Sequence, residues 1–425
     1  MKILAAEFVL PISSEPIEGG AVVIDGDRII AVGTQGELTT QFPNVPVDDF
    51  GVAAIIPGLV NCHSHLEVTS MRGALDEVEH DFKSWLLKLN DLRSGLTPED
   101  IEAAATLGAS EGARAGVTCF GDIGRCGEAG LSALNSVGLR GVLFQETEFS
   151  PDNATAKDDL DKLKSKIESL RRSADGLVEV GISPHSPYTV SRRLFELIAL
   201  YAKDEDLKVT IHAAESADEE TLLAKGEGFF TKFYERVGVE WEVPHSSSIE
   251  FLHRTGILDT RPLLAHCVTV SDSDIHLIAK SGSRIAHCPK SNAKFGHGYA
   301  PFEKFVEAGI AVGLGSDSVA SNNICDLLEE ARFAAFVARN HLERSRFITS
   351  RDMLEAATLG GAKALGLDDK IGTLEAGKQA DIAVVSLSEL AQSPLNDVEA
   401  ALLFSSNARD VVKTLVAGKV VFDSK

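Results

Sequence analysis

The chain has 425 residues, which is enough for one domain of barrel size plus a smaller one. Its formal net charge of −22 at pH 7 argues against nucleic-acid binding, which needs a basic surface, and against docking to anionic membranes. With 44% hydrophobic and 24% charged residues, the composition is that of an ordinary globular protein.

The first 55 residues are predicted to be rich in β-strands. Residues 1–10 are apolar with a single lysine, lack the length and cleavage site of a signal peptide, and are expected to form a strand. Two further apolar runs, 20–24 and 28–33, lie on either side of Asp25-Gly26-Asp27, a sequence typical of a hairpin turn.

The middle of the chain, residues 56–365, alternates short apolar runs with amphipathic stretches. Eight strands, each followed by a helix, predict a (β/α)8 TIM barrel of the α/β class. A doubly wound open sheet is the alternative, but the chain lacks the Gly-rich phosphate loop that follows the first strand of that fold. The expected strands are residues 53–60, 117–120, 139–144, 178–182, 209–211, 263–265, 284–286 and 310–314.

The chain returns to strands at its C-terminal end. Residues 381–385, 411–416 and 419–422 are apolar runs, and Ala417-Gly418 is the expected turn between the last two. Two β-rich ends around a different middle predict a small β-sandwich domain assembled from residues 1–55 and 366–425. Residues 216–250, after the fifth strand of the barrel, are expected to form an insertion at the rim of a pocket.

The cysteines and the apolar segments favour a protein of the cytoplasm. None of the six cysteines has Cys-x-x-Cys spacing. Cys62, Cys119, Cys267 and Cys288 lie in or beside expected buried strands, where cysteine acts as a small hydrophobic residue. Unpaired cysteines fit a reducing compartment. No segment reaches the ~18 uninterrupted apolar residues of a membrane span.

Residues that bind metals end four of the expected strands. The first apolar run leads into His63 and His65, whose i, i+2 spacing puts both side chains on one side of an extended segment. Three other runs end at His212, at His266 and at Asp317. Neutral imidazole is the commonest protein metal ligand, and TIM barrels place their sites at the C-terminal ends of strands. The repetition predicts a metal centre, which a lone His-x-His pair would not.

These and other motifs together resemble the amidohydrolase superfamily, in its cytosine-deaminase-like branch. That branch includes deaminases of S-adenosylhomocysteine, methylthioadenosine, aminodeoxyfutalosine and guanine, together with triazine hydrolases of the chlorohydrolase-like group. The matching motifs span nearly the whole chain. They are Pro57-Gly58-Leu59-Val60-Asn61-Cys62-His63-Ser64-His65, Ser183-Pro184-His185-Ser186-Pro187-Tyr188, His212-Ala213-Ala214-Glu215, Ala265-His266-Cys267, Gly315-Ser316-Asp317 followed by Ala320-Ser321-Asn322, and residues 372–381.

The resemblance implies a single divalent metal ion, Zn or Fe, held by His63, His65, His212 and Asp317. Imidazole and carboxylate ligands suit both metals. Relatives with two metals bridge them with a modified lysine on the fourth strand. Here the fourth strand, residues 178–183, contains no lysine and leads to His185, so one metal is expected.

The resemblance also implies a hydrolytic deaminase that releases ammonia from an adenine-type nucleoside by attack of metal-bound hydroxide. Asp317 would accept a proton from the water, His266 would orient or polarise that water, and Glu215 would protonate the ring nitrogen. Each side chain also has a structural interpretation. Glu215 would be an acid at a helix N-terminus, His266 a hydrogen-bonded core histidine, and His185 the support of a turn.

The residues expected to contact the substrate lie mainly after the first strand. Packing within a helical core is the alternative for the apolar ones, and helix capping is the alternative for the asparagine. They are Met71, Trp85, Arg93, His185 and Asn322. Adenosine-type deaminases of this branch carry a glutamate after their Trp-Leu motif, which binds the ribose hydroxyls. No glutamate stands at that point here, and Asp91 is the available substitute.

Three hypotheses for the function follow. The first is the nucleoside deaminase, of the aminodeoxyfutalosine, S-adenosylhomocysteine or methylthioadenosine class. The second is a relative that acts on guanine or a pterin, or that displaces chloride or an amide. The third is a metal-binding scaffold without catalysis, which the presence of every expected ligand opposes. The resemblance further implies a homo-oligomer. His287 ends the seventh expected strand, and the sequence leaves open whether it supports the site; the expected surface histidines are His80, His245, His253, His276 and His341.

Overall fold

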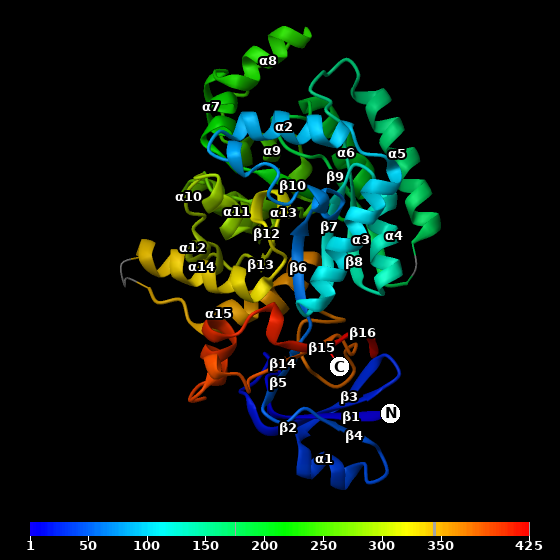
Figure 1. The fold of residues 1–425 in the computed structure, drawn as a ribbon. Coiled ribbons are helices and arrows are strands. Elements are labelled where there is room, and N and C mark those ends of the chain that lie inside the picture. The colour runs from blue at the N-terminus through cyan, green and yellow to red at the C-terminus, as the bar shows by residue number, and fades with distance from the viewer. Residues whose placement is uncertain (175, 343–345, 425) are drawn as a thin grey trace.

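The computed structural model describes residues 1–174, 176–342 and 346–424. Both chain termini lie in a sheet-containing lower part of the molecule, and parallel strands surrounded by helices form the upper part (Figure 1). The helices are α1 (Gln35–Gln41), α2 (Phe82–Ser94), α3 (Pro98–Arg114), α4 (Gly127–Val137), α5 (Ala156–Ser173), α6 (Arg192–Asp204), α7 (Ala217–Lys225), α8 (Phe229–Val237), α9 (Ser248–Arg254), α10 (Asp272–Ser281), α11 (Pro289–Lys294), α12 (Phe302–Glu307), α13 (Val319–Asn322), α14 (Leu327–Leu342), α15 (Ser350–Glu355), α16 (Gly361–Leu365) and α17 (Val398–Ala400).

Strands from both ends of the chain form one eight-stranded sheet with the order β16-β15-β14-β5-β1-β2-β3, and β4 pairs with β1. Strand β5 joins the two ends, because it pairs parallel with β1 and antiparallel with β14. The two halves of the predicted sandwich are therefore linked by a continuous path of hydrogen bonds. The strands are β1 (Lys2–Val9), β2 (Ile17–Asp25), β3 (Arg28–Thr34), β4 (Val47–Asp49), β5 (Ala53–Pro57), β14 (Ile382–Ser386), β15 (Val411–Val416) and β16 (Lys419–Asp423).

The apolar run 53–60, expected as one strand, is two strands that belong to different sheets. The break lies at Pro57-Gly58, where the N–H of Gly58 donates at 2.9 Å to the carbonyl of Asp381, the residue before β14 of the lower sheet. A Cβ atom on Gly58 would lie 2.1 Å from Oγ1 of Thr118, so only glycine fits this crossing. The prediction of a single strand was wrong because hydrophobicity is equal on both sides of the break.

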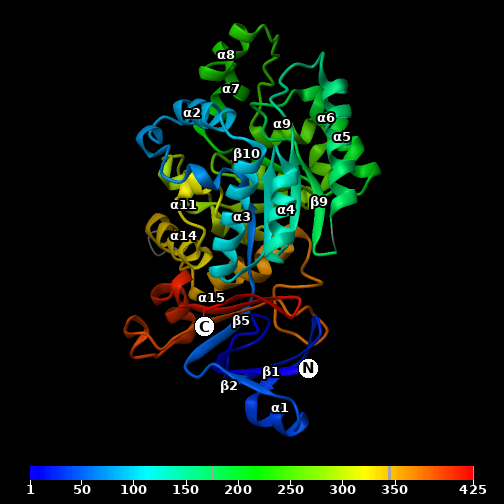
Figure 2. The ribbon, with the colours of Figure 1, turned by 45° about the vertical axis from the view of Figure 1, so that its right-hand side comes forward.

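The upper part contains two four-stranded parallel sheets, with the orders β6-β7-β8-β9 and β10-β11-β12-β13. Isolated parallel bridges connect them at Ile182 with Val209 and at Ser64 with Asp317. Helices α3 to α6 cover the first sheet on its outer side (Figures 1 and 2). The strands are β6 (Leu59–Ser64), β7 (Val117–Gly124), β8 (Arg140–Glu146), β9 (Val178–Ser183), β10 (Thr210–Ala213), β11 (Leu263–His266), β12 (Arg284–His287) and β13 (Val312–Leu314).

Helix α3 illustrates how local sequence sets these elements. Thr97 and Asp100 form a reciprocal capping box at its start, and Pro98 occupies the first turn, where its missing N–H costs nothing. Gly112 lies on the buried side, and a Cβ there would come within 2.2 Å of the Phe120 ring on β7. The helix can therefore pack closely against the strand.

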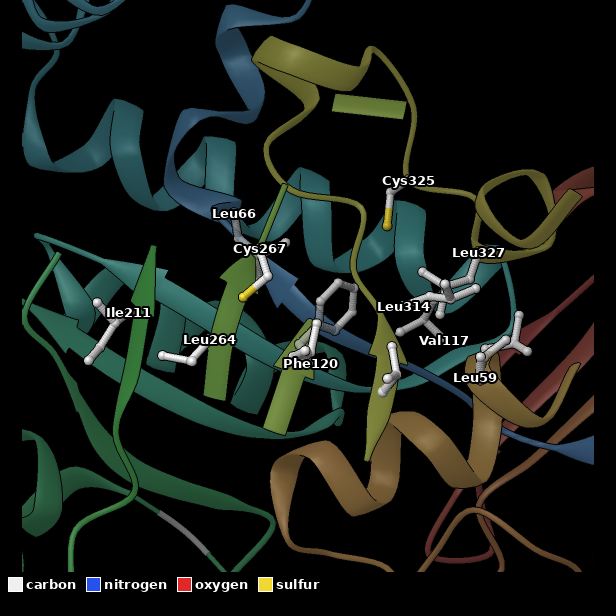
Figure 3. Close-up of a cluster of buried hydrophobic side chains, with 14 of the residues drawn as sticks. Leu59, Leu66, Val117, Phe120, Ile211, Leu264, Cys267, Leu314, Cys325 and Leu327 are labelled. Atoms are coloured by element: carbon white, nitrogen blue, oxygen red, sulfur yellow. The ribbon is translucent and has the colours of Figure 1, made fainter. Parts of the chain in front are cut away.

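Apolar side chains from both parallel sheets form a common core (Figure 3). Phe120, Ile211, Leu264 and Leu314 come from four different strands and are buried. Burial of each such side chain stabilises the fold by about 1.5–3 kcal/mol. The four cysteines expected in the core, Cys62, Cys119, Cys267 and Cys288, are buried free thiols. Within the described ranges, no helix has both the length and the apolar character that crossing a membrane requires.

The insertion expected over residues 216–250 contains α7 and α8 and the start of α9. Together with α2, helices α7 and α8 lie beyond the C-terminal ends of the parallel strands, at the top of the molecule (Figure 1). They are therefore positioned to cover whatever lies at those strand ends.

Candidate metal centre and pocket

The predicted ligands meet because each lies at the C-terminal end of a parallel strand. His63 is in β6 and His65 directly follows it, His212 is in β10, His266 ends β11, and Asp317 follows β13. The N–H of Asp317 donates to the carbonyl of His63 at 3.0 Å and ties the last strand to the first. His266 and Asp317 have φ angles of 72° and 55°, a left-handed conformation that costs about 1–3 kcal/mol and is concentrated at functional sites.

Four side chains place their nitrogen and oxygen atoms close together. Nε2 of His65 lies 3.2 Å from Nε2 of His212, and Oδ1 of Asp317 lies 3.5 Å from Nε2 of both His63 and His65. The possible ligand atoms of His63, His212, His266 and Asp317 all lie within 4.8 Å of one another. The structure thus brings all five strand-end residues to one point.

The donor set fits a divalent metal ion. Both ring nitrogens of His63 are buried without a hydrogen-bond partner among the described residues, an arrangement that is costly unless something else binds there. Burial lowers the pKa of His63, His65 and His212 below the ordinary range, so that these imidazoles are neutral. Two nitrogens on a tetrahedral zinc would be about 3.3 Å apart, which matches the contact between His65 and His212.

Hydrogen bonds fix the orientation of two of these ligands. Nδ1 of His212 lies 3.1 Å from the carbonyl of His185, so that Nε2 faces the site. Ser291 and Ser321 donate their hydroxyls to Oδ2 of Asp317 at 2.6 and 3.0 Å, and Oδ1 faces the histidines. Burial opposes ionisation of Asp317, but the facing histidines hold its pKa well below the usual range.

One ring nitrogen of His266 has a hydrogen-bond partner among the described residues, which bears on its two interpretations. Nδ1 of His266 lies 2.9 Å from Oδ1 of Asn292. Its Nε2 is buried without a partner in the described part of the chain and lies 3.8 Å from Oε1 of Glu215. Within the described residues His266 therefore does not have both ring nitrogens hydrogen-bonded, as a core histidine would, and Asn292 orients the ring.

Glu215 is buried beside the ligands and is not the acid of a helix N-terminus. Its Oε2 accepts a hydrogen bond from the Tyr188 hydroxyl at 3.1 Å. Helix α7 starts two residues later, and Glu219 supplies the carboxylate that accepts the N–H groups of Ala214 and Glu215. Burial, and then the charge of Asp317, raises the pKa of Glu215 to about 8. Glu215 can therefore hold a proton near neutral pH.

A cavity of about 370 Å³ opens above these residues. Helix α2 contributes Phe82, Trp85 and other side chains to its wall, and helix α8 contributes Phe229, Phe230 and Phe233. Phe295 packs edge-on against both Phe82 and Trp85 at ring-centroid distances of 5.2 and 5.0 Å. The floor of the cavity is formed by the histidines and carboxylates at the strand ends, and its cover is formed by the aromatic side chains of α2 and α8. This arrangement is expected for a site that binds a flat, partly apolar molecule.

Three of the five expected substrate contacts lie on this cavity. Trp85, Arg93 and His185 are part of its wall. Met71 is instead buried in an apolar cluster. Asn322 donates its side-chain N–H groups to the carbonyl of Ser316 at 2.6 Å and to the carboxylate of Glu330. Neither Met71 nor Asn322 is among the residues that border the cavity in the described structure.

Several cavity residues were missed by the sequence interpretation. Glu67, Arg125 and Glu146 form charged parts of the wall, and Arg93 pairs with Glu67. His297 is half-buried with its ring stacked on Phe295, which borders the cavity, and its Nε2 lies 3.8 Å from Oε1 of Glu215. The only available signal was position: Glu146 ends β8 as the ligands end their strands.

The histidines expected at the surface agree with that prediction, and His287 is buried. The five expected at the surface, His80, His245, His253, His276 and His341, are exposed. His287 is buried at the end of β12, and its ring lies 5.9 Å from that of Phe302. Burial lowers the pKa of His287 to about 4, so it is neutral.

Comparisons with known proteins agree with this geometry. The Amidohydrolase family matches residues 54–421, and an imidazolonepropionase-like composite domain of bacteria matches residues 20–44. The chain is 32% identical over 415 residues to the 5-methylthioadenosine/S-adenosylhomocysteine deaminase of Moorella thermoacetica, which covers 97% of this chain and 92% of that protein.

Solved structures extend the similarity to three dimensions. An adenosine deaminase from Xanthomonas campestris with bound zinc is similar with a TM-score of 0.88 and 29% identity, over 98% of this chain and 92% of that one. An atrazine chlorohydrolase from Arthrobacter aurescens, complexed with zinc, has a TM-score of 0.84 and 25% identity over 100% and 95% of the two chains.

Proposed function

The chain belongs to the amidohydrolase family, and from this premise we propose that it is a metal-dependent hydrolytic deaminase of an adenine-type nucleoside. The observation that supports the reaction best is the protonatable Glu215 beside the converged histidines and Asp317. The relatives support the substrate class, since one is named for methylthioadenosine and S-adenosylhomocysteine and another is an adenosine deaminase.

Family membership implies a TIM-barrel fold of mixed α/β content. We propose that the two parallel sheets close into a (β/α)8 barrel within residues 56–365. The bridges between Ile182 and Val209 and between Ser64 and Asp317 support closure at both seams. Residues 1–55 and 366–425 would then form the accessory β domain, in which β5 pairs with strands from both ends.

We propose that one divalent ion is held by His63, His65, His212 and Asp317, with Zn favoured by the zinc-bound neighbours and Fe as the alternative. The unpartnered nitrogens of His63, in the part of the chain that is described, support a ligand at this point. The ion would supply Lewis acidity, which lowers the pKa of water toward neutrality.

The residues of the chain would then manage protons and position. Hydrolytic deamination adds water at the amino-bearing carbon, moves a proton to the adjacent ring nitrogen and another to the departing ammonia. Asp317 would accept a proton from the water, and His266, oriented by Asn292, would align that water. Glu215 would donate to the ring nitrogen, a task suited to a carboxyl group whose pKa is about 8.

The aromatic cover would bind the base and exclude water. Trp85 and Phe295 offer apolar faces to a flat heterocycle, and Phe230 closes the other side together with Tyr188. Removing water from the cavity strengthens the hydrogen bonds made there. His185 and Arg93 are proposed as polar contacts to the substrate.

Displacement of another group from a related heterocycle is the second candidate. The structural similarity to an atrazine chlorohydrolase favours it, because the same floor would serve attack on a chlorinated ring. A guanine- or pterin-type deaminase shares the same chemistry on a different base.

A spectroscopic assay of nucleoside conversion distinguishes these options. Purified enzyme reconstituted with one equivalent of zinc is expected to convert 5′-methylthioadenosine or a related adenine nucleoside into its inosine counterpart. Enzyme stripped by a chelator should lose this activity, and addition of zinc should restore it. Unchanged activity in the fully stripped enzyme would refute the role of the metal.

A further inference from the structure

Glu146 offers the pocket a carboxylate oxygen that nothing else in the described chain uses. It ends β8 in the wall of the cavity and is buried, with 4% of its surface exposed. Its Oε1 has no hydrogen-bond partner among the residues described. A buried carboxylate oxygen without a partner is costly and calls for a donor, which in a pocket wall is a group of the substrate.

The other carboxylate oxygen of Glu146, Oε2, already accepts a hydrogen bond, and this bond fixes the position of Oε1. Nε of Arg125 donates to Oε2 at 3.0 Å, and the same guanidinium donates to Oδ1 of Asn90 at 3.2 Å. The Gln145 side chain donates to the carbonyls of both Arg125 and Glu146 at 3.0 Å. The carboxylate is therefore held in one orientation before any ligand arrives.

A second group of matching chemistry lies next to this oxygen. Nε2 of His185 is 3.8 Å from Oε1 of Glu146, too far for a hydrogen bond between them. Nδ1 of His185 is occupied by the hydroxyls of Ser186 and Thr189, at 2.9 and 2.8 Å. One fixed acceptor and one fixed ring nitrogen side by side suit two adjacent hydroxyl groups.

A second metal ion is the competing occupant, because Glu146, His185 and His212 together have the spacing of a ligand group. His212, however, uses Nδ1 on the carbonyl of His185 and directs Nε2 at His65. Only two ligands would remain for a second ion, which is fewer than protein metal sites use. A neutral hydroxyl donor is the better match.

The position of Glu146 relative to Glu215 indicates which hydroxyl groups of a nucleoside would reach Glu146. The ring centroid of His212 lies 4.8 Å from that of His185 and 5.5 Å from that of His266. Oε1 of Glu215 lies 3.8 Å from Nε2 of His266, and Oε1 of Glu146 lies 3.8 Å from Nε2 of His185. Glu215 and Glu146 thus face different histidines, so a base that reacts beside Glu215 would leave the sugar of its nucleoside toward His185 and Glu146.

We propose that Glu146, together with His185, binds the vicinal hydroxyls of the substrate's ribose, an inference that rests on the proposed nucleoside deaminase function. Asp91, the substitute considered from the sequence, is exposed and does not border the cavity within the described residues. Glu146 would thus be the residue that selects ribonucleosides. It lies at the end of a strand, whereas Asp91 lies on helix α2.

The first test uses the unmodified, zinc-loaded enzyme. Adenosine or 5′-methylthioadenosine is compared with its 2′,3′-dideoxy counterpart, and kcat/KM for ammonia release is measured for both. A site built to hydrogen-bond hydroxyls should discriminate by roughly 100-fold or more. Equal kcat/KM values for the two nucleosides would overturn the inference while leaving the deaminase intact. Absence of ammonia from every adenine nucleoside would instead overturn the proposed function, and the inference with it.

The second test assigns the discrimination to Glu146. Glu146→Gln keeps the size and replaces one acceptor oxygen by a donor, so it should lower kcat/KM for the ribonucleoside about 10- to 100-fold and leave the dideoxy analogue nearly unchanged. Glu148→Gln is the matched control, because Glu148 is exposed and pairs with Lys166 at 2.9 Å outside the cavity. The metal content of the Glu146 variant should equal that of the wild type.

Two outcomes would contradict this assignment. Equal loss on both nucleosides would show that Glu146 acts on the reacting groups and not on the sugar. Loss of one metal equivalent from a wild type that holds two would show that Glu146 is a metal ligand.

Discussion

The floor and the cover of the pocket differ in how they are built. The floor consists of side chains at the ends of parallel strands, among them His63, His212 and Asp317, which neighbouring strands fix through backbone hydrogen bonds. The cover comes from helices α2 and α8, which lie beyond the strands and contribute aromatic side chains. Floor residues supply polar atoms from hydrogen-bonded strand ends, while cover residues supply apolar area.

This difference separates the reaction from its selectivity. A floor of histidines and carboxylates defines a hydrolytic chemistry that different heterocycles can share, as the similarity to both a deaminase and a chlorohydrolase illustrates. The proposed function would place the aromatic cover, and wall residues such as Glu146, against the parts of a substrate that do not react. Variants of the floor should therefore lower kcat, and variants of the cover should raise KM.

The largest effect is expected for Asp317→Asn. Replacement of the anionic ligand removes the charge that faces His63 and His65 and should lower both the metal content and kcat/KM, the latter by at least about 1,000-fold. Metal analysis and ammonia release measure the two effects. Full activity with full metal occupancy would remove Asp317 from the proposed centre.

Glu215→Gln should have the next largest effect, with the metal retained. An amide of the same size cannot deliver a proton, so kcat should fall roughly 100- to 10,000-fold, the usual range for loss of a general acid. Glu220→Gln, on the exposed side of α7, is the matched control and should behave like the wild type. A Glu215 variant with wild-type kcat would eliminate the proposed proton donor.

Phe233→Ala tests the cover. Phe233 borders the cavity and stacks edge-on against Phe149 at 5.4 Å. Loss of this apolar area should raise KM about 10-fold with kcat within a few-fold of the wild type, equivalent to about 1.4 kcal/mol of binding. Phe336→Ala removes an exposed ring elsewhere and serves as the control. A large fall in kcat with unchanged KM would break the distinction between floor and cover.

The smallest effect on catalysis is expected for Glu330, which lies beneath the floor and whose predicted effect is on stability. Burial raises the pKa of Glu330 to about 8 from the ordinary carboxyl value of 4.5. A folded-state pKa above the unfolded one stabilises the protein at low pH, and that stabilisation is lost between about pH 4.5 and 8. Glu330→Gln should remove this loss and reduce the pH slope of the unfolding free energy by up to about 1.4 kcal/mol per pH unit. Denaturant unfolding of the wild type and the variant at pH 5, 6, 7 and 8 measures this slope. Equal slopes for the two proteins would show that Glu330 is ionised in the folded state.

The same contrast explains what could be predicted from the sequence. His63, His65, His212, His266 and Asp317 each follow an apolar run, so a local pattern and the rule for strand ends sufficed to predict that they meet. The hairpin at Asp25-Gly26-Asp27 and the return of the C-terminal strands were equally local. Residues of this kind are predictable because strand order alone brings them together.

The cover depends on tertiary packing and was predicted only in part. Trp85 and Met71 both follow β6 and belong to one apolar cluster, yet of the two described side chains Trp85 borders the cavity and Met71 does not. Nothing in the local sequence separates the two, since tertiary packing decides which of them reaches the cavity. His297 was missed for the same reason, because its role follows from neighbours distant in the chain, whereas Glu146 had the strand-end signal and its pairing with His185 did not.

The most direct test of the account is ammonia release by metal-quantified enzyme across adenine nucleosides, guanine, pterins and a chlorotriazine. The account predicts one ammonia per molecule from adenine nucleosides, abolished in Glu215→Gln at unchanged metal content. Ammonia only from guanine or a pterin, or chloride release from the triazine without any deamination, would contradict it.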